Sequence, residues 1–283
     1  NLFFLPTKSV PFHKKNRLHR LSTCIYAKFS LPLHTNINTT MQDERYLQLL
    51  SRKFPNAQSV VTELINLRAI LSLPKGTEHF VSDLHGEANA FIHMIKNASG
   101  VIRKKVDEAF GDLLPEEEKR ALCALIYYPD ERIDWVKRKY NGEEIHSLNE
   151  GFEYTTIQDW YKRRLHQVVA IARAVTIKYS RSKVYKLLPK DYAYVIKELL
   201  HESSLEQKDR QAYYNAIIEA IIETGCAEQL LISITYFIHS MAIDILHVVG
   251  DIFDRGPRPH KIVDVLSTIR DYDIQWGNHD IEW

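Results

Sequence analysis

Apolar residues recur at three- and four-residue steps along most of this chain, which is the spacing of one face of an α-helix. The first such run covers residues 43–72 and contains Pro55, so it predicts two helices, because proline interrupts a helix. Nearly all of the stretch from about 106 to 241 carries the same pattern. Predicted helices outside the first run cover 87–98, 156–179, 187–200 and 205–224.

Three short apolar runs interrupt this pattern and predict β-strands. They cover 79–82, 245–249 and 273–276. A helix expected from Pro259 to about Ile269 separates the last two runs, and a strand–helix–strand unit of this length has parallel strands. The sequence therefore predicts an α/β fold with a large helical insertion, at about 100–240, between its first two strands.

Composition and charge are typical of a globular protein and do not favour a nucleic-acid-binding or membrane-spanning one. Hydrophobic residues make up 45% of the 283 residues and charged residues 26%, which is typical of a globular chain. The first 40 residues hold six basic and no acidic residues, so the remainder carries a net charge of −5 and gives no support for nucleic-acid binding. Three widely spaced cysteines fit a reducing compartment. With no apolar run of about 18 residues, we expect no membrane span.

Neither end of the chain resembles the end of an intact protein. Residues 1–40 show no helical or strand periodicity, and the first methionine is Met41. A targeting peptide would also be basic and poor in acids, and a disordered native arm is an alternative. We favour a non-native leader over 1–40. Trp283 follows a candidate motif by three residues, so we expect 41–283 to be an incomplete domain, truncated at its C-terminus.

A polar motif follows each predicted strand. The motifs are Asp-Leu-His-Gly at 83–86, Gly-Asp-Ile-Phe-Asp-Arg-Gly at 250–256 and Gly-Asn-His-Asp at 277–280. Taken singly, they can be read as a chance triplet, a salt-bridged loop and a turn. Together they fall where open α/β sheets bind ligands, beyond the carboxyl ends of the strands. Carboxylate, imidazole and amide oxygen suit a divalent metal such as manganese, so we predict a metal site at this edge.

This ordered set of motifs resembles the calcineurin-like metallophosphoesterase superfamily, in the branch that includes the Ser/Thr protein phosphatases. The resemblance implies a partial metallophosphoesterase sheet in which two metal ions activate a bridging water for attack on phosphorus. It also implies the metal ligands. Asp83 and His85 would bind the first metal, Asp251 would bridge both, and Asn278 would bind the second metal and the phosphate.

The same resemblance implies the catalytic and substrate-binding groups. His279 would protonate the leaving oxygen, oriented by Asp254. Arg255 would hold the phosphate oxygens as a fork. Asp280 stands where some branches carry Glu. The superfamily's further histidine ligands lie beyond this chain, and three earlier histidines do not replace them. These are His239, His260 and His247, the last expected to be a hydrogen-bonded core residue.

The spacing of the motifs indicates which family of this superfamily the chain resembles. His85 and Asp251 are 166 positions apart, whereas one crossover needs about 30 residues. A phosphoesterase core with a large helical insertion here resembles the class III fructose-1,6-bisphosphatases. Residues 46–55, 73–80 and 97–100 also resemble that family, although Ala88 replaces an expected aromatic residue. The match runs from Met41 to the end of the chain, and family members are more than twice as long as this stretch.

The family resemblance implies removal of the 1-phosphate from fructose 1,6-bisphosphate, giving fructose 6-phosphate in gluconeogenesis. It implies two manganese ions, a small phosphorylated sugar as partner, no nucleic acid or membrane, and a cytoplasmic enzyme that could form a homo-oligomer. We expect this fragment to be inactive, because the second metal has few ligands. The alternatives are a phosphoprotein phosphatase, a nucleotide hydrolase or an inactive scaffold. The basic runs 137–139 and 162–164 are expected to be solvated helix surface, rather than a phosphate site.

Overall fold

The computed structural model describes residues 41–142, 154–201 and 208–282, and the chain divides into two units, 1–75 and 76–283. The first unit contains α2 (Met41–Lys53) and α3 (Ala57–Leu71). Asn56 caps α3 by accepting a hydrogen bond from the Ser59 amide at 2.8 Å. Two helices interrupted at Pro55 are what the apolar pattern predicts, so this prediction is confirmed.

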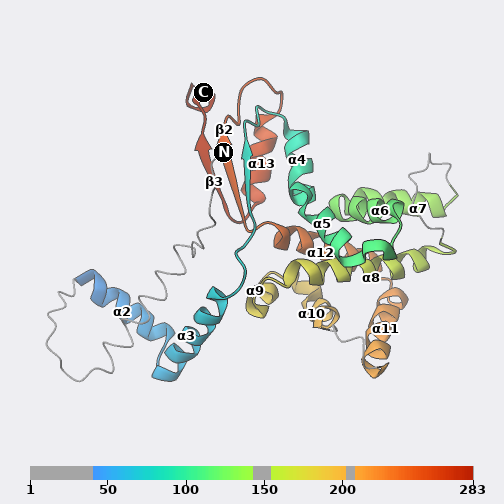
Figure 1. Cartoon of the computed structure of the whole chain (residues 1–283), viewed down its shortest axis with the longest axis horizontal. Coiled ribbons are helices and arrows are strands. Elements are labelled where there is room, and N and C mark those ends of the chain that lie inside the picture. Colours follow the sequence, from blue (N-terminus) through green and yellow to red (C-terminus); the bar gives the residue numbers. More distant parts are fainter. Residues whose placement is uncertain (1–40, 143–153, 202–207, 283) are drawn as a thin grey trace. The chain divides into compact units, whose positions relative to one another are not determined.

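The second unit contains a three-stranded parallel sheet in the order β1-β2-β3 (Figure 1). Its strands are β1 (Glu78–Ser82), β2 (Ile245–Gly250) and β3 (Tyr272–Trp276). The register pairs Ser82 with Val249 and Gly250 with Trp276, so all three carboxyl ends lie at one edge. The three predicted strands and the parallel pairing of the last two are confirmed. The protein is thus α/β, mostly helical with a small parallel sheet.

Two helices, α4 (Ala88–Asn97) and α13 (Pro259–Thr268), cover one face of the sheet (Figure 1). Val81 and Val248 face them and pack with Phe91 of α4 and Ile262 of α13. These buried contacts fix the strand ends against a rigid support.

The opposite face of the sheet carries exposed apolar side chains. Phe80 is 68% exposed and Val249 is 39% exposed. His247 stacks on Phe80 at 4.4 Å between ring centroids and bonds through Nδ1 to Asp273 at 2.9 Å. The prediction that His247 is hydrogen-bonded is confirmed, but its predicted place in the core is wrong, because the strand alternation directs it to this open face.

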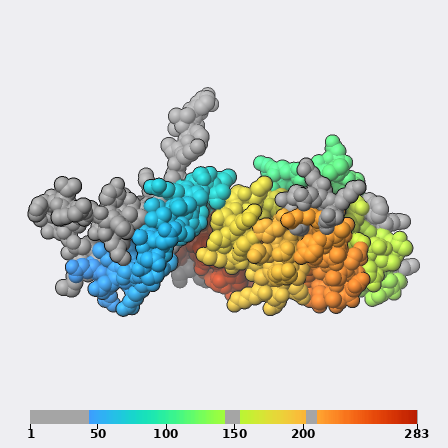
Figure 2. Space-filling view, turned by 90° about the horizontal axis from the view of Figure 1, so that it is seen from below, coloured from blue at the N-terminus to red at the C-terminus, as the bar shows by residue number. Residues whose placement is uncertain are grey.

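The helical insertion forms a body of its own around α8, which packs most extensively against α12. Thr156 and Asp159 form a capping box that begins α8. Figures 1 and 2 show α9, α10 and α11 side by side on one side of this body. The helices of the body are α5 (Val101–Phe110), α6 (Glu116–Tyr127), α7 (Pro129–Tyr140), α8 (Ile157–Thr176), α9 (Arg181–Lys186), α10 (Ala193–His201), α11 (Lys208–Glu223) and α12 (Ala227–Ala242).

Two sequence expectations for this body need revision. The helix predicted over 187–200 is confirmed in part. Its start is wrong, because Pro189 and a 3₁₀ turn at Lys190–Tyr192 precede α10, which begins at Ala193. The start predicted at residue 205 lies outside the described residues. None of the described helices is long and apolar enough to cross a membrane.

The basic run at 162–164 is solvated only in part, because the side chains of Lys162 and Arg163 are partly exposed but that of Arg164 is not. Arg164 is fully buried, and Arg163 donates two hydrogen bonds to the buried Glu118, at 2.6 and 2.9 Å. Gln167 donates a third at 2.7 Å. Burial by itself would raise the pKa of Glu118, but these hydrogen bonds lower it. Arg163 and Arg164 therefore belong to an ion-pair network between α6 and α8, whereas Lys162 is exposed and pairs with Glu219 of α11.

Asp244, immediately before β2, joins the helical body to the amino ends of the strands. Its carboxylate accepts a hydrogen bond from the Thr77 amide at 2.7 Å, beside β1. Tyr179 and Lys183, which lie after α8 and on α9, also donate to it. The helical body is thus fixed to the edge of the sheet opposite the polar motifs.

Candidate metal centre

The loops after β1 and β2 extend the pairing of the sheet beyond the strands. The Asp83 amide bonds to the Val249 carbonyl at 3.1 Å, and the His85 amide bonds to the Asp251 carbonyl at 3.0 Å. The Gly86 amide continues the series to the Ile252 carbonyl at 2.8 Å. The first two motifs therefore run side by side with a fixed register.

Glycines allow these two loops to touch. The Gly256 amide bonds to the His85 carbonyl at 2.7 Å. A Cβ on Gly256 would lie 2.2 Å from that carbonyl oxygen, and a Cβ on Gly86 would lie 2.5 Å from the Gly256 oxygen. Because such distances are far inside van der Waals contact, both positions need glycine for close backbone approach.

This arrangement brings three of the predicted metal ligands together. Asp83, His85 and Asp251 each offer a ligand atom, and these atoms lie within 4.8 Å of one another. Asp251 is buried, and the Nδ1 atom of His85 is buried without a hydrogen-bond partner among the described residues. A buried polar atom without a partner is costly, and a divalent cation is one group that would satisfy it. Two carboxylates and an imidazole fit such a cation.

The backbone of these loops is strained at positions that the sequence did not reveal. Asp83 and His85 have φ angles of 53° and 43°, and Asp254 and Arg255 have 72° and 61°. The left-handed region is unfavourable for residues with a side chain. Such strain persists only where the surroundings enforce it, and it is concentrated at functional sites.

The third motif meets the second at the same edge. Asn278 begins the short helix α14 (Asn278–Glu282), with an exposed side chain. The amide of its neighbour His279 bonds to Asp251 Oδ1 at 3.0 Å. The His279 ring lies with Nδ1 3.8 Å from Asp254 Oδ2, and Arg255 Nε lies 3.3 Å from the same oxygen. The predicted pair of His279 and Asp254 is therefore within ion-pair distance.

Two further residues at this edge were not assigned roles from the sequence. The Asp280 carboxylate accepts hydrogen bonds from the amides of Ile252 and Phe253, each at 2.9 Å. A Cβ on Gly277 would lie 2.0 Å from Asp251 Oδ1. Their places within the third motif were the available signal, but the partners are 26 to 28 positions away and become visible only in the fold.

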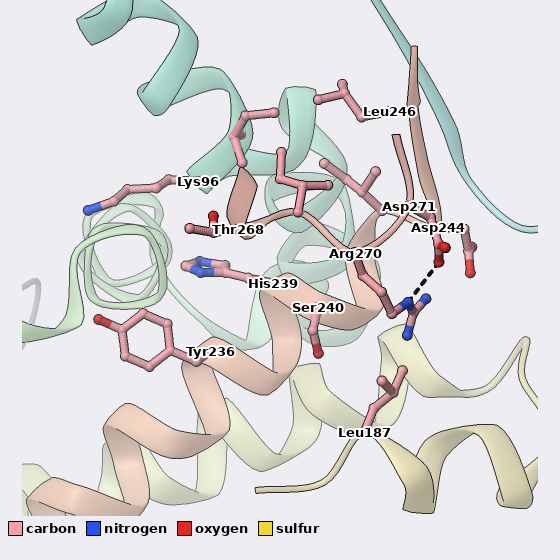
Figure 3. Close-up of a pocket in the computed structure, with 13 residues that line it drawn as sticks. Lys96, Leu187, Tyr236, His239, Ser240, Asp244, Leu246, Thr268, Arg270 and Asp271 are labelled. Carbon is pink, nitrogen blue, oxygen red and sulfur yellow. Dashed lines mark hydrogen bonds and ion pairs between the residues drawn. The ribbon is translucent and has the colours of Figure 1, made fainter. Parts of the chain in front are cut away.

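A cavity of about 370 Å³ lies elsewhere, at the amino ends of β2 and β3 (Figure 3). Tyr236 and His239 of α12 line it together with Lys96 and Arg270. Burial lowers the pKa of His239 to about 4, so its imidazole is neutral near pH 7. No predicted site residue lines this cavity. The candidate metal centre is therefore a separate site, at the opposite edge of the sheet.

Comparison with known proteins gives a consistent family. A family model described as Firmicute fructose-1,6-bisphosphatase matches residues 45–283. A class 3 fructose-1,6-bisphosphatase of Phocaeicola vulgatus is 51% identical over 245 residues, which are 87% of this chain and 34% of the relative. One of Clostridium tetani is 46% identical over 248 residues, 88% of this chain and 35% of the relative. The chain thus spans about a third of the length of these relatives. No solved structure matches it.

Proposed function

We propose a function from one premise, which is that the chain belongs to the Firmicute fructose-1,6-bisphosphatase family. It carries part of the site at which the whole protein hydrolyses the 1-phosphate of fructose 1,6-bisphosphate, giving fructose 6-phosphate and phosphate. The observation that carries this proposal is the cluster of Asp83, His85 and Asp251 at the carboxyl edge of the sheet. The chain covers about a third of its relatives, so the activity is assigned to the whole protein.

The proposed cofactor is a pair of manganese ions on a calcineurin-like metallophosphoesterase sheet. Asp83 and His85 would hold the first ion, Asp251 would contribute to both, and Asn278 would contribute to the second. Bound divalent cations polarise a phosphoryl group and lower the pKa of water. The close approach of the three ligand atoms and the mixed oxygen and nitrogen donors support this assignment.

The remaining groups act on the substrate directly. His279 gives a proton to the leaving sugar oxygen, and Asp254, 3.8 Å away, orients the imidazole. Arg255 holds phosphate oxygens through its planar guanidinium, and its side chain is 71% exposed and so accessible to a ligand. A role in gluconeogenesis, a cytoplasmic location and a homo-oligomer belong to the same proposal and rest on the family resemblance.

The test uses a chimera in which this chain replaces the matched third of the Phocaeicola vulgatus relative. Asp251→Asn should lose phosphate release from fructose 1,6-bisphosphate, because it removes the charge that holds both ions. Asp264→Ala is the matched control, since Asp264 is an exposed residue of α13 whose carboxylate pairs with Lys261.

Manganese content and a substrate panel complete the experiment. We expect the unsubstituted chimera to prefer the sugar bisphosphate to phosphopeptides and nucleotides. Near-normal turnover of Asp251→Asn with intact manganese content would refute the bridging role. Preference for a phosphopeptide or nucleotide would replace the proposed substrate.

A further inference from the structure

We infer that Asp280 is a positioning residue that clamps the loop after β2 and thereby places Asp251 for metal binding, an inference that rests on the proposed function. Its carboxylate lies at the junction of the second and third motifs. One oxygen accepts from the amides of Ile252 and Phe253 at 2.9 Å, and the other accepts from Ile252 at 3.1 Å. Two consecutive amides of one loop are thus held by a side chain of another.

The clamp is reciprocal. While Asp280 accepts from the loop after β2, Asp251 Oδ1 accepts from the His279 amide at 3.0 Å. Each loop therefore uses a carboxylate to satisfy the backbone of the other. Two such links fix both the distance and the rotation between the loops, which a single hydrogen bond would leave free.

The clamp requires an acceptor with no donor of its own. An ionised carboxylate is acceptor-only, and its hydrogen bonds to backbone amides are charge-assisted and strong. An amide side chain at 280 would bring its NH2 group toward one of the two N–H groups. Because Ile252 is 3% exposed, water has little access to its amide if the acceptor is lost.

Strain in the same loop makes the clamp necessary. Asp254 and Arg255 follow the clamped amides directly and both lie in the left-handed region. Such conformations persist only when neighbouring contacts enforce them. Without Asp280 the loop would relax toward lower-energy φ angles and would carry Asp251 and Asp254 away from their positions.

The test compares Asp280→Ala, Asp280→Asn and Asp280→Glu with the native chain, and Asp264→Ala is the control. Amide hydrogen exchange by NMR, on the metal-free chain, reports the clamp itself. We expect protection of Ile252 and Phe253 to fall at least about 10-fold in Asp280→Ala. Mn²⁺ binding, followed by electron paramagnetic resonance, reports ligand placement. We expect affinity to fall about 10- to 100-fold.

Recovery of Mn²⁺ affinity in Asp280→Glu distinguishes a positioning role of Asp280 from general stabilisation of the fold. Asp280→Glu keeps an acceptor-only group and should recover part of the Mn²⁺ affinity, whereas Asp280→Asn should not. Asp264→Ala should match the native chain in both measurements. Circular dichroism establishes that each variant is folded. If Asp280→Ala does not fold, Asp280→Asn supplies the comparison.

The outcomes distinguish this inference from the function on which it rests. If the native chain binds no Mn²⁺ but Asp280→Ala loses amide protection, the metal proposal fails and the clamp stands as a structural link. If a folded Asp280→Ala or Asp280→Asn binds Mn²⁺ like the native chain, the positioning role is overturned. Loss of folding in both variants overturns it as well, because Asp280 would then stabilise the fold rather than place a ligand.

Discussion

Replacing Gly277 with alanine should disable the metal centre by steric displacement of one ligand. The added Cβ would lie 2.0 Å from Asp251 Oδ1, 2.6 Å from its Cγ and 2.7 Å from its backbone nitrogen. The conflict with backbone prevents relief by side-chain rotation alone. Gly277 does not have a positive φ, so the backbone conformation itself tolerates alanine.

The size of the effect follows from these distances. Real Cβ contacts are essentially never under 3.0 Å, so Asp251 must move by about 1 Å. Metal ligands are held to within about 0.2 Å of their ideal distances, and a displacement of about 1 Å at a catalytic site costs about 100-fold. We therefore expect Mn²⁺ affinity to fall at least about 10-fold. Overpacking should lower the free energy of unfolding by about 1–3 kcal/mol.

The assay is Mn²⁺ titration by electron paramagnetic resonance, with urea unfolding in parallel. Gly100→Ala is the matched control, because Gly100 has a φ of +84° and nothing within 4 Å of the added Cβ. We expect the Gly100→Ala chain to lose about 1 kcal/mol of its free energy of unfolding, because alanine is strained at this φ angle, and to keep the native Mn²⁺ affinity. A folded Gly277→Ala chain with native Mn²⁺ affinity would refute the placement of Asp251 against Gly277.

Three other predictions test the site, the junction of the helical body and the open sheet face. Calorimetric titration should give one tightly bound Mn²⁺ per chain, because one group of three acidic or imidazole ligands lies in the part of the chain that the structure describes. Burial alone would raise the pKa of Asp244, but hydrogen bonds from Lys183 and Tyr179 lower it. Ionised Asp244 therefore stabilises the folded chain fully near pH 7, and this stabilisation is lost as the carboxylate is protonated below about pH 4. In urea unfolding, the free energy of unfolding of the native chain should thus fall more steeply below about pH 4 than that of Asp244→Asn. Phe80→Thr should reduce self-association in light scattering, because Phe80 is 68% exposed on the open sheet face; unchanged association would exclude that face.

Much of the architecture is determined by local sequence. The three strands follow from short apolar runs, and the interruption at Pro55 follows from the missing amide of proline. Once β2 and β3 are joined by a helix, their parallel pairing follows, and the carboxyl ends of parallel strands meet at one edge. The meeting of Asp83, His85 and Asp251 was therefore predictable from the order of strands and motifs.

Other features depend on which segments meet in three dimensions. Arg164 is buried because α6 brings Glu118 to α8, and His247 lies on the open face because α4 and α13 cover the other. Asp280 acquires its partners because α14 follows a strand that is in register with β2. Periodicity reports only which residues share a face of their own element. Register, loop approach and the strained angles at Asp254 and Arg255 arise from packing between elements, so only the tertiary structure decides them.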